Sequence, residues 1–552
     1  MGPFLSHPPV SLQRCLPLNT ICQRGVELLP TAPWKHVTTI IKHSEKLCRE
    51  QSYPVMFPDP SLHGRTAERF IMTSCVHNDV VGLRNRYMKE SPNKFGPKHP
   101  ELFQQAIDEL VAALKPNFKG VKPLKDLLAK KRGKLRKRYD DAARNILENG
   151  FHLEKHSKVK AFIKNEVYNE CKPPRMIMGR DPRFFLAYAP LIDAIEEAMK
   201  HLPEISKGRN FAERGEQFFE KVLGDIIAGI DFRKFESTQS LELLAHIELS
   251  IIFGLIEAGL CGRAIKLWVA KLKIEGYTLH DIYFMLFGLR CTGEADTGCF
   301  NTLITWVACR YCELVNKLGI RNFICDGDDN LMRIPLGADF VDTFAELGLD
   351  AKIEIFYDYH DVEYCSGRFI QITPGVFHYV QDPRKLMQNL PVFRKKKFEH
   401  CMGVYYHSLG YMYNVLYPNF PLYSNIGKFL MKMAPDRHIS MEMLNEINPS
   451  HAEAFSNTKQ KVSIDYDLVR VEIAMSFNYT IEEVRRYEAW YDEHLVILPP
   501  ENNKRYNAEK TPAVLLTDQQ IDQVEQIISE SVDKHVFSKS YRDYIIGPLL
   551  ML

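Results

Sequence analysis

The sequence lacks a long hydrophobic run. Its best apolar stretch, residues 249–260, is interrupted by Glu257, and the apolar end at 545–552 is far shorter than the roughly 20 residues that cross a bilayer. No membrane-spanning segment is therefore expected.

A paired cysteine framework is also missing. The 13 cysteines are an odd and scattered number, and Cys309 with Cys312 has no second Cys-x-x-Cys pair to complete a zinc site. We expect free thiols, which is typical of a reducing compartment such as the cytosol.

The sequence also has little net charge. The formal net charge of +2 is low for a protein that coats nucleic acid, although it permits a basic channel balanced by acidic surface elsewhere. Basic stretches at 130–138 and 394–397 are candidate walls of such a channel.

With 552 residues, of which 45% are hydrophobic and 25% charged, the chain should form several packed subdomains around a shared cleft.

Hydrophobic periodicity predicts an α+β protein. It indicates strands at 226–231 and 352–357, a strand pair within 322–334 that turns at Gly327, and a hairpin that turns at Pro374 and Gly375. Helices are expected at 102–114, 241–260, 297–318 and 339–347, and the region after about residue 379 is expected to be mostly helical. The first 95 residues show no long periodic segment, and a loop at 499–512 precedes a last helix capped by Thr517.

Three carboxylates stand out in this pattern. Asp328 and Asp329 follow Gly327 at the tip of the predicted hairpin, and Asp231 ends an apolar strand about a hundred residues earlier. A Gly-Asp-Asp turn alone is weak, since these residues are common in surface turns. If the strand lies beside the hairpin, however, the three acids converge as ligands for a pair of Mg²⁺ ions, with Mn²⁺ as an alternative, in a phosphoryl-transfer site.

Two further segments suit a nucleotide substrate. In RCTGEADTGCFN, Asn301 lies on the first turn of a helix, and together with Glu236 it could hydrogen-bond a ribose 2′-hydroxyl; plain helix capping is the alternative for this segment. In the segment 160–182, cations alternate with apolar residues, so that one face can pack on the protein and the other can contact a triphosphate. Its cations include Lys164, Lys172, Arg175 and Arg180.

These segments, in this order, resemble the polymerase motifs of positive-strand RNA viruses, and they are most similar to the tombusvirus-like group. KAFIKNE, KPPRMI and GRDPR resemble the fingertip motif, AGIDFRKFE the first palm motif, TGEADTGCFN the second and GDDN the third. EYCSGRF resembles the hairpin that grips the primer strand. The match spans about residues 160–371.

The resemblance implies a right-hand fold and a set of residue roles. Asp231, Asp328 and Asp329 would hold the metals, and Lys352 stands where the family has a lysine proposed to protonate pyrophosphate. The remaining roles are ribose binding by Glu236, Thr292, Thr297 and Asn301, and triphosphate binding by Lys164, Lys172, Arg175 and Arg180. Thr292 replaces the usual serine and keeps its hydroxyl. Glu236 stands where the family usually has aspartate, and its longer side chain could contact the ribose from a slightly different position.

The domain boundaries expected from this resemblance are fingers at 1–224, with the fingertip motif at 160–182, and a palm at 225–377. A second fingers segment at about 245–290 is interleaved in the palm, and the thumb with the C-terminal tail follows at 378–552. The expected partners are template and nascent RNA, ribonucleoside triphosphates and other viral replication proteins. The expected location is the host cytoplasm or a membrane-bound replication complex.

Two rival functions remain open at this point. A reverse transcriptase would share the acids but normally carries an aromatic gate where Glu236 stands and an aromatic residue where Gly327 stands. A non-catalytic RNA-binding replication scaffold would have a degenerate site, which the intact acids oppose.

Overall fold

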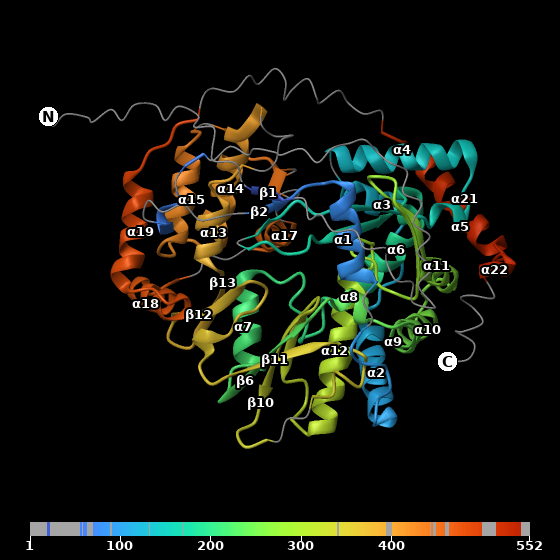
Figure 1. Cartoon of the computed structure of the whole chain (residues 1–552), viewed down its shortest axis with the longest axis horizontal. Coiled ribbons are helices and arrows are strands. Elements are labelled where there is room, and N and C mark those ends of the chain that lie inside the picture. The colour runs from blue at the N-terminus through green and yellow to red at the C-terminus, as the bar shows by residue number, and fades with distance from the viewer. Residues whose placement is uncertain are drawn as a thin grey trace.

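A computed structural model describes fourteen segments of the chain: residues 19–21, 56–57, 59–62, 70–88, 91–131, 133–168, 170–338, 342–393, 400–435, 437–441, 443–444, 449–458, 463–498 and 515–541. They form a mixture of helices and sheets (Figure 1), which confirms the predicted mixed class. No disulfide joins two cysteines within these segments. None of the helices described there is long and apolar enough to span a bilayer.

A four-stranded antiparallel sheet occupies the centre. Its strands are β6 (Ile226–Phe232), β9 (Phe323–Asp326), β10 (Asp329–Ile334) and β11 (Ala351–Phe356), in the order β11-β6-β10-β9. Side chains of β6 alternate between two hydrophobic cores, with Ile230 in one and Ile227 in the other. Because successive residues of a strand point to opposite faces, the sheet is covered on both sides.

The larger core is built mainly from helices. It contains α2 (Pro100–Leu114), α6 (Pro182–Met199), α10 (Ser250–Glu257), α11 (Arg263–Leu272) and α12 (Thr297–Asn316). Residues of α3 (Leu124–Ala129), α4 (Gly133–Asn149), α5 (Leu153–His156), α8 (Phe235–Thr238) and α9 (Leu241–Leu244) also belong to this core. Residues of α12 are buried almost throughout, so this helix lies within the protein rather than on its surface.

The second core lies on the other face of the sheet. It contains α7 (Phe211–Lys221), the hairpin of β12 (Gly367–Thr373) and β13 (Val376–Gln381), and a group of helices that follow this hairpin in the chain. These are α13 (Pro383–Asn389), α14 (Met402–Leu416), α15 (Tyr423–Lys432), α17 (Pro449–Asn457), α18 (Tyr466–Phe477) and α19 (Ile481–Glu493). The predicted helical character after residue 379 is thus confirmed for the described part.

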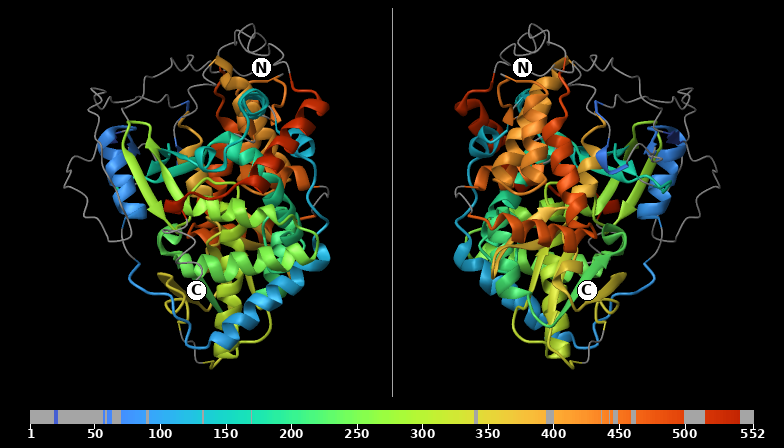
Figure 2. Two further views of the ribbon diagram at one scale, coloured as in Figure 1. Left: turned by 90° about the vertical axis from the view of Figure 1, so that its right-hand side faces the viewer. Right: turned by 90° about the vertical axis from the view of Figure 1, so that its left-hand side faces the viewer.

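A second four-stranded sheet joins the segment 160–182 to residues 273–287. Its order is β5-β3-β7-β8, formed by β3 (Val159–Ile163), β5 (Met176–Arg180), β7 (Lys273–Thr278) and β8 (Tyr283–Phe287). Helix α1 (Val76–Tyr87) packs against this sheet (Figure 2). A small sheet of β1 (Asn19–Ile21), β2 (Phe70–Met72) and β4 (Val167–Tyr168) adjoins it.

The last long helix packs against elements from earlier in the chain. Helix α21 (Asp518–Lys534) packs on α4, α3 and α11 (Figure 1), and its apolar residues join the larger core. The following turn, α22 (Lys539–Tyr541), places the Tyr541 hydroxyl where it donates to the backbone oxygen of Ala270 at 2.5 Å. The C-terminal region therefore contacts elements from the first half of the chain.

Most predicted elements are confirmed, with two exceptions. Residues 342–347 of the helix expected at 339–347 are not helical: 344–346 form a turn, and Leu347 makes a β-bridge with Phe95. Helix α1 arises where no periodic segment was expected. The Thr517 cap is confirmed as a capping box with Gln520. The loop at 499–512 and the basic stretch at 394–397 lie outside the described residues.

Candidate active site

The Gly-Asp-Asp turn is a two-residue connection between β9 and β10. Gly327 adopts φ of +70°, a left-handed conformation that glycine accepts without a Cβ clash, as the first central residue of such hairpin turns requires. Its backbone N–H donates to the Thr302 hydroxyl at 2.9 Å. Since Thr302 is buried in α12, the helix that follows the second palm-like motif holds the turn in place.

The three predicted carboxylates come together at this turn. Asn330 of β10 pairs with Ile230 of β6, so one step further along the register Asp329 faces Asp231. Both acids lie on the same face of the sheet, because residues directly opposite each other on neighbouring strands share a face. Directly opposed side chains on one face have Cβ atoms about 5 Å apart. Asp328 occupies the turn beside them.

The pKa values of Asp328 and Asp329 reflect the proximity of the carboxylates. Burial, followed by the charges of Asp328, Asp326 and Asp231, raises the pKa of Asp329 to about 7 although its side chain keeps contact with solvent. The pKa of Asp328 is also raised, by burial and then by the charges of Glu236 and Asp231. Mutual repulsion of this kind is relieved when a cation binds.

The chemistry of these donors fits a divalent cation. Among the described residues, none of the three carboxylates forms an ion pair with a cationic side chain. No group of three or more His, Cys, Asp or Glu residues in the described segments is already gathered around a metal-sized point. Carboxylates that repel one another are expected to stand apart without a cation, and oxygen ligands suit Mg²⁺.

Glu236 and Thr292, two of the predicted ribose residues, are in contact. The Thr292 hydroxyl donates to Glu236 Oε1 at 3.1 Å. Arg86 Nη2 donates to both carboxylate oxygens of Glu236, at 2.8 and 2.7 Å. Burial opposes the charge on Glu236, but Arg86 beside it and the hydrogen bonds hold its pKa below the usual value. The carboxylate is therefore ionised at neutral pH.

Asn301 is held by a separate chain of contacts. Its Oδ1 accepts from Gln239 Nε2 at 3.0 Å, and Gln239 Oε1 accepts from Arg290 Nε at 3.2 Å. Arg290 is completely buried and forms ion pairs with Glu248 and Asp296. Asn301 thus stands at one end of a network that reaches deep into the larger core.

That network is a buried ionic cluster. Lys271 pairs with Glu248 at 2.8 Å and with Asp296, and the Tyr188 hydroxyl donates to Asp296 Oδ2 at 3.1 Å. Although burial opposes charge on Asp296, Lys271 and Arg290 hold its pKa well below the usual value. Asp296 directly precedes α12, so the cluster fixes the start of the helix that carries Asn301.

Thr297, the remaining predicted ribose residue, binds its own loop. Its hydroxyl donates to the backbone oxygen of Cys291 at 2.7 Å and accepts from the backbone N–H of Glu294 at 3.1 Å. Thr297 is the first residue of α12, and the N-cap Asp296 makes no side-chain cap hydrogen bond, so plain capping, the alternative that the sequence left open, is not what these contacts show.

The four predicted triphosphate cations occupy different environments. Lys164 and Arg175 are both about half exposed and flank Glu166, at 2.6 and 3.8 Å. Arg175 is close enough to Asp328 to lower that residue's pKa, against the larger effects of burial and Glu236. Lys172 is half exposed and lies over the Tyr168 ring at 5.2 Å. These three cations are open to a ligand.

Arg180 differs from them. Its guanidinium is 3% exposed, pairs with Glu294 and donates to the backbone oxygens of Ser157 and Lys271. In this arrangement Arg180 binds protein groups, and it would contact a triphosphate only after exchanging them.

Lys352 lies next to the carboxylates. It is the direct partner of Asp231 in the pairing of β11 with β6, and its Nζ contacts Glu354 at 2.5 Å on the exposed face. A short shift of this flexible side chain would bring the ammonium towards the acids.

Several site residues escaped the sequence reasoning. Asn330 lies inside the GDDN motif, and Thr302 directly follows TGEADTGCFN. Asn330 Nδ2 bridges the backbone oxygens of Ile230 and Asp328, at 3.2 and 3.3 Å. A closer reading of these motifs could have included them. Arg86, by contrast, lies in a segment with no motif, and nothing in the sequence connects it with Glu236.

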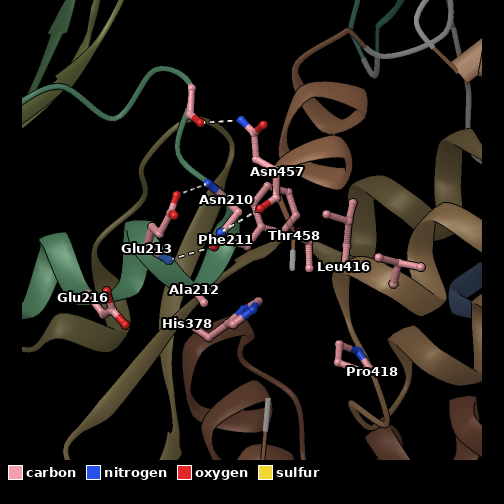
Figure 3. Close-up of a pocket in the computed structure, with 12 residues that line it drawn as sticks. Asn210, Phe211, Ala212, Glu213, Glu216, His378, Leu416, Pro418, Asn457 and Thr458 are labelled. Atoms are coloured by element: carbon pink, nitrogen blue, oxygen red, sulfur yellow. Dashed lines mark hydrogen bonds between the residues drawn. The ribbon is translucent and has the colours of Figure 1, made fainter. Parts of the chain in front are cut away.

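A separate pocket lies between α7, α14 and α17 (Figure 3). It has a volume of about 380 Å³ and includes Asn210, Glu216, His378 and Asn457 in its lining. Burial lowers the pKa of His378 to about 4, so this ring is neutral near pH 7. None of the predicted site residues lines this pocket.

Comparison with known proteins shows a family to which this chain is similar. Residues 156–413, just under half of the chain, match a family described as RNA dependent RNA polymerase. The matched range contains the central sheet, the Gly-Asp-Asp turn and the segment 160–182. The predicted resemblance to RNA-dependent RNA polymerases of positive-strand RNA viruses is thereby confirmed.

Individual relatives agree with the family match. The chain is 23% identical over 347 residues to an RNA-directed RNA polymerase of Oat chlorotic stunt virus, covering 56% of this chain and 44% of the relative. It is 26% identical over 329 residues to that of Groundnut rosette virus, covering 55% and 38%. A replicase large subunit of Tobacco rattle virus is 26% identical over 187 residues, covering 32% and 10%. The matched part of the chain thus spans less than half of each of these relatives.

Proposed function

We propose that this protein copies a viral RNA template into RNA from ribonucleoside triphosphates, for replication of the viral genome. The observation that carries the proposal is the juxtaposition of Asp231 with Asp328 and Asp329 on one face of the central sheet. This juxtaposition falls inside the segment that resembles RNA-dependent RNA polymerases.

In this function the three aspartates would hold two Mg²⁺ ions, with Mn²⁺ as an alternative. When bound, such ions make a ribose 3′-hydroxyl a better nucleophile and neutralise charge on the phosphates. Lys164, Lys172 and Arg175 would bind the triphosphate, and Lys352 would deliver a proton to the leaving pyrophosphate.

The remaining predicted residues would act on the nucleotide from its ribose side. Glu236, Thr292 and Asn301 would contact the 2′-hydroxyl, since each offers a polar group that accepts or donates a hydrogen bond. Thr297 and Arg180 would support them by fixing the loop at 291–294, because both bind groups of that loop.

The proposed function also implies an assignment of the subdomains. We assign fingers to 1–224, including 160–182, a palm to 225–377 with an interleaved fingers segment at about 245–290, and a thumb with its tail to 378–552. The interleaved assignment is supported by the sheet that pairs β7 with β3. Helix α21 would then extend from the thumb side back to the fingers.

The partners of such an enzyme would be template and nascent RNA, ribonucleoside triphosphates and other viral replication proteins. Its place of action would be the host cytoplasm or a membrane-bound replication complex. The basic stretch at 130–138 remains a candidate wall for the RNA channel; Arg136 within it pairs with Asp140 and Lys130 with Asp193.

The proposal is tested by incubating the protein with unprimed RNA, Mg²⁺ and labelled ribonucleotides. We expect template-length RNA from the wild type and none from Asp231→Ala, while Asp225→Asn, which changes an exposed aspartate just before the same strand, stays active. A preference for deoxyribonucleotides would indicate a reverse transcriptase. RNA binding without nucleotide addition, unaffected by Asp328→Asn, would indicate a scaffold.

A further inference from the structure

The C-terminal end of α1 reaches the proposed ribose side of the site. Arg86 and Tyr87 are its last two residues, and they contact Glu236 and Thr292, which lie 150 and 205 residues further along the chain. Neither α1 residue belongs to a polymerase-like motif. The range that matches the polymerase family begins at residue 156, well after this helix.

The ion pair between Arg86 and Glu236 is well shielded. The two side chains are 14% and 8% exposed, and one guanidinium nitrogen donates to both carboxylate oxygens. Because removal of one partner from a buried pair leaves the other charge uncompensated, Arg86 is required to keep Glu236 ionised and in a fixed orientation. Arg86 is also near enough to Asp328 to interact with its charge.

Tyr87 orients the neighbouring hydroxyl. It is completely buried, and its oxygen lies 2.6 Å from Thr292 Oγ1 and accepts from the Thr292 backbone N–H at 3.2 Å. The Thr292 hydroxyl has a single proton, which it donates to the ionised Glu236. The Tyr87 hydroxyl must therefore donate to Thr292 Oγ1. Each hydroxyl between Tyr87 and Glu236 therefore has one donor direction: Tyr87 donates to Thr292, and Thr292 donates to Glu236.

The chain of contacts has a consequence for nucleotide selection. A hydroxyl group of a substrate is recognised well only when the protein's donors and acceptors are fixed before binding, and a site built to bind a hydroxyl rejects the analogue without it. Glu236 has one more methylene than the aspartate that the polymerase resemblance leads us to expect, so its carboxylate has more rotational freedom to lose. The contacts from Arg86 and Tyr87 remove that freedom.

We propose that Arg86 and Tyr87 are positioning residues for ribose selection, which place Glu236 and Thr292 so that ribonucleotides are preferred over deoxyribonucleotides. The inference rests on the proposed function. It adds α1, a helix outside the polymerase-like segment, to the part of the protein that discriminates sugars.

The test is single-nucleotide incorporation with a ribonucleotide and with its 2′-deoxy analogue. The measured quantity is the ratio of kcat/KM for the two substrates, which a general loss of stability leaves unchanged. We expect Arg86→Ala to lower this ratio about tenfold, the size typical of one lost hydrogen bond, and Tyr87→Phe to lower it by a smaller factor. Arg86→Lys, which keeps the charge but not the planar fork, should fall between the wild type and Arg86→Ala.

Arg470→Ala is the matched control. Arg470 forms a two-point pair with Glu488, both side chains 11% exposed, between α18 and α19 in the second core. Its removal should lower stability as removal of Arg86 does, but the substrate ratio should stay at the wild-type value.

The outcomes separate the inference from the proposed function. An unchanged ratio in Arg86→Ala and Tyr87→Phe overturns the inference while ribonucleotide incorporation upholds the function. An equal loss of both substrates overturns it too, because Arg86 would then act on phosphate or catalysis rather than on the sugar. If Arg86→Ala does not fold, Arg86→Lys and Tyr87→Phe decide by the same ratio. A wild type that incorporates neither nucleotide refutes the function itself.

Discussion

Replacing Asp329 by asparagine should stabilise the metal-free protein while it abolishes nucleotide incorporation. Asp329 faces Asp231 across two paired strands and lies beside Asp328, so its negative charge is opposed by both. Asparagine has nearly the same size and no charge, and it would relieve this repulsion. The same change removes a proposed metal ligand, so stability and activity should move in opposite directions.

The magnitude follows from the pKa of Asp329, which is raised from 3.8 to about 7. In a dry site this difference would correspond to roughly 4 kcal/mol. Because the side chain keeps contact with solvent, screening reduces the effect, and we expect a gain of about 1 to 2 kcal/mol.

The gain should depend on pH in a defined direction. Since the pKa is higher in the folded protein, the folded state takes up this proton first as the pH falls, and the penalty of the charged form disappears. Its contribution to stability is fully present below pH 3.8 and is lost as the pH rises to about 7. The difference between Asp329→Asn and wild type should therefore be largest above pH 7 and small towards pH 4.

Thermal unfolding of both proteins at about pH 8 and about pH 5, without divalent cations, measures this difference. Asp225→Asn serves as a control for the loss of an exposed aspartate. Adding Mg²⁺ near pH 8 should then raise the melting temperature of the wild type more than that of Asp329→Asn. The reasoning is refuted if Asp329→Asn melts at or below the wild-type temperature at the higher pH while the control is unchanged.

Three further predictions follow from the site. Thr302→Val should leave the partly buried Gly327 N–H without its partner, cost about 1 kcal/mol and lower kcat, and Thr302→Ser should restore both in unfolding and incorporation assays. Asp296→Asn should lower stability by about 3 to 5 kcal/mol in denaturant unfolding, because it leaves two buried cations with Glu248 as their one remaining carboxylate partner; a loss below about 1 kcal/mol would contradict this. Lys352→Ala should slow incorporation about a hundredfold with an unchanged substrate KM, as expected for a general acid, and a raised KM with unchanged kcat would argue against that role.

Local patterns in the sequence were sufficient for the parts of the site that lie within single segments. The apolar strand that leads to Asp231 and the tight turn at Gly327 both depend on neighbouring residues, and each is present as predicted. Short-range rules fail where a distant contact decides the conformation. Leu347 pairs with Phe95 instead of continuing a helix.

By itself the sequence determined the strands, the turn, the acids they carry and the polymerase-like order of the motifs, because backbone preference and residue type are local properties. Only the tertiary structure decided which groups hold those acids in place. Arg86 meets Glu236 across 150 residues, and Arg290 joins Glu248 to Asp296 inside the core. Such pairs form because a buried charge must find a partner, and the partner is chosen by how the elements pack.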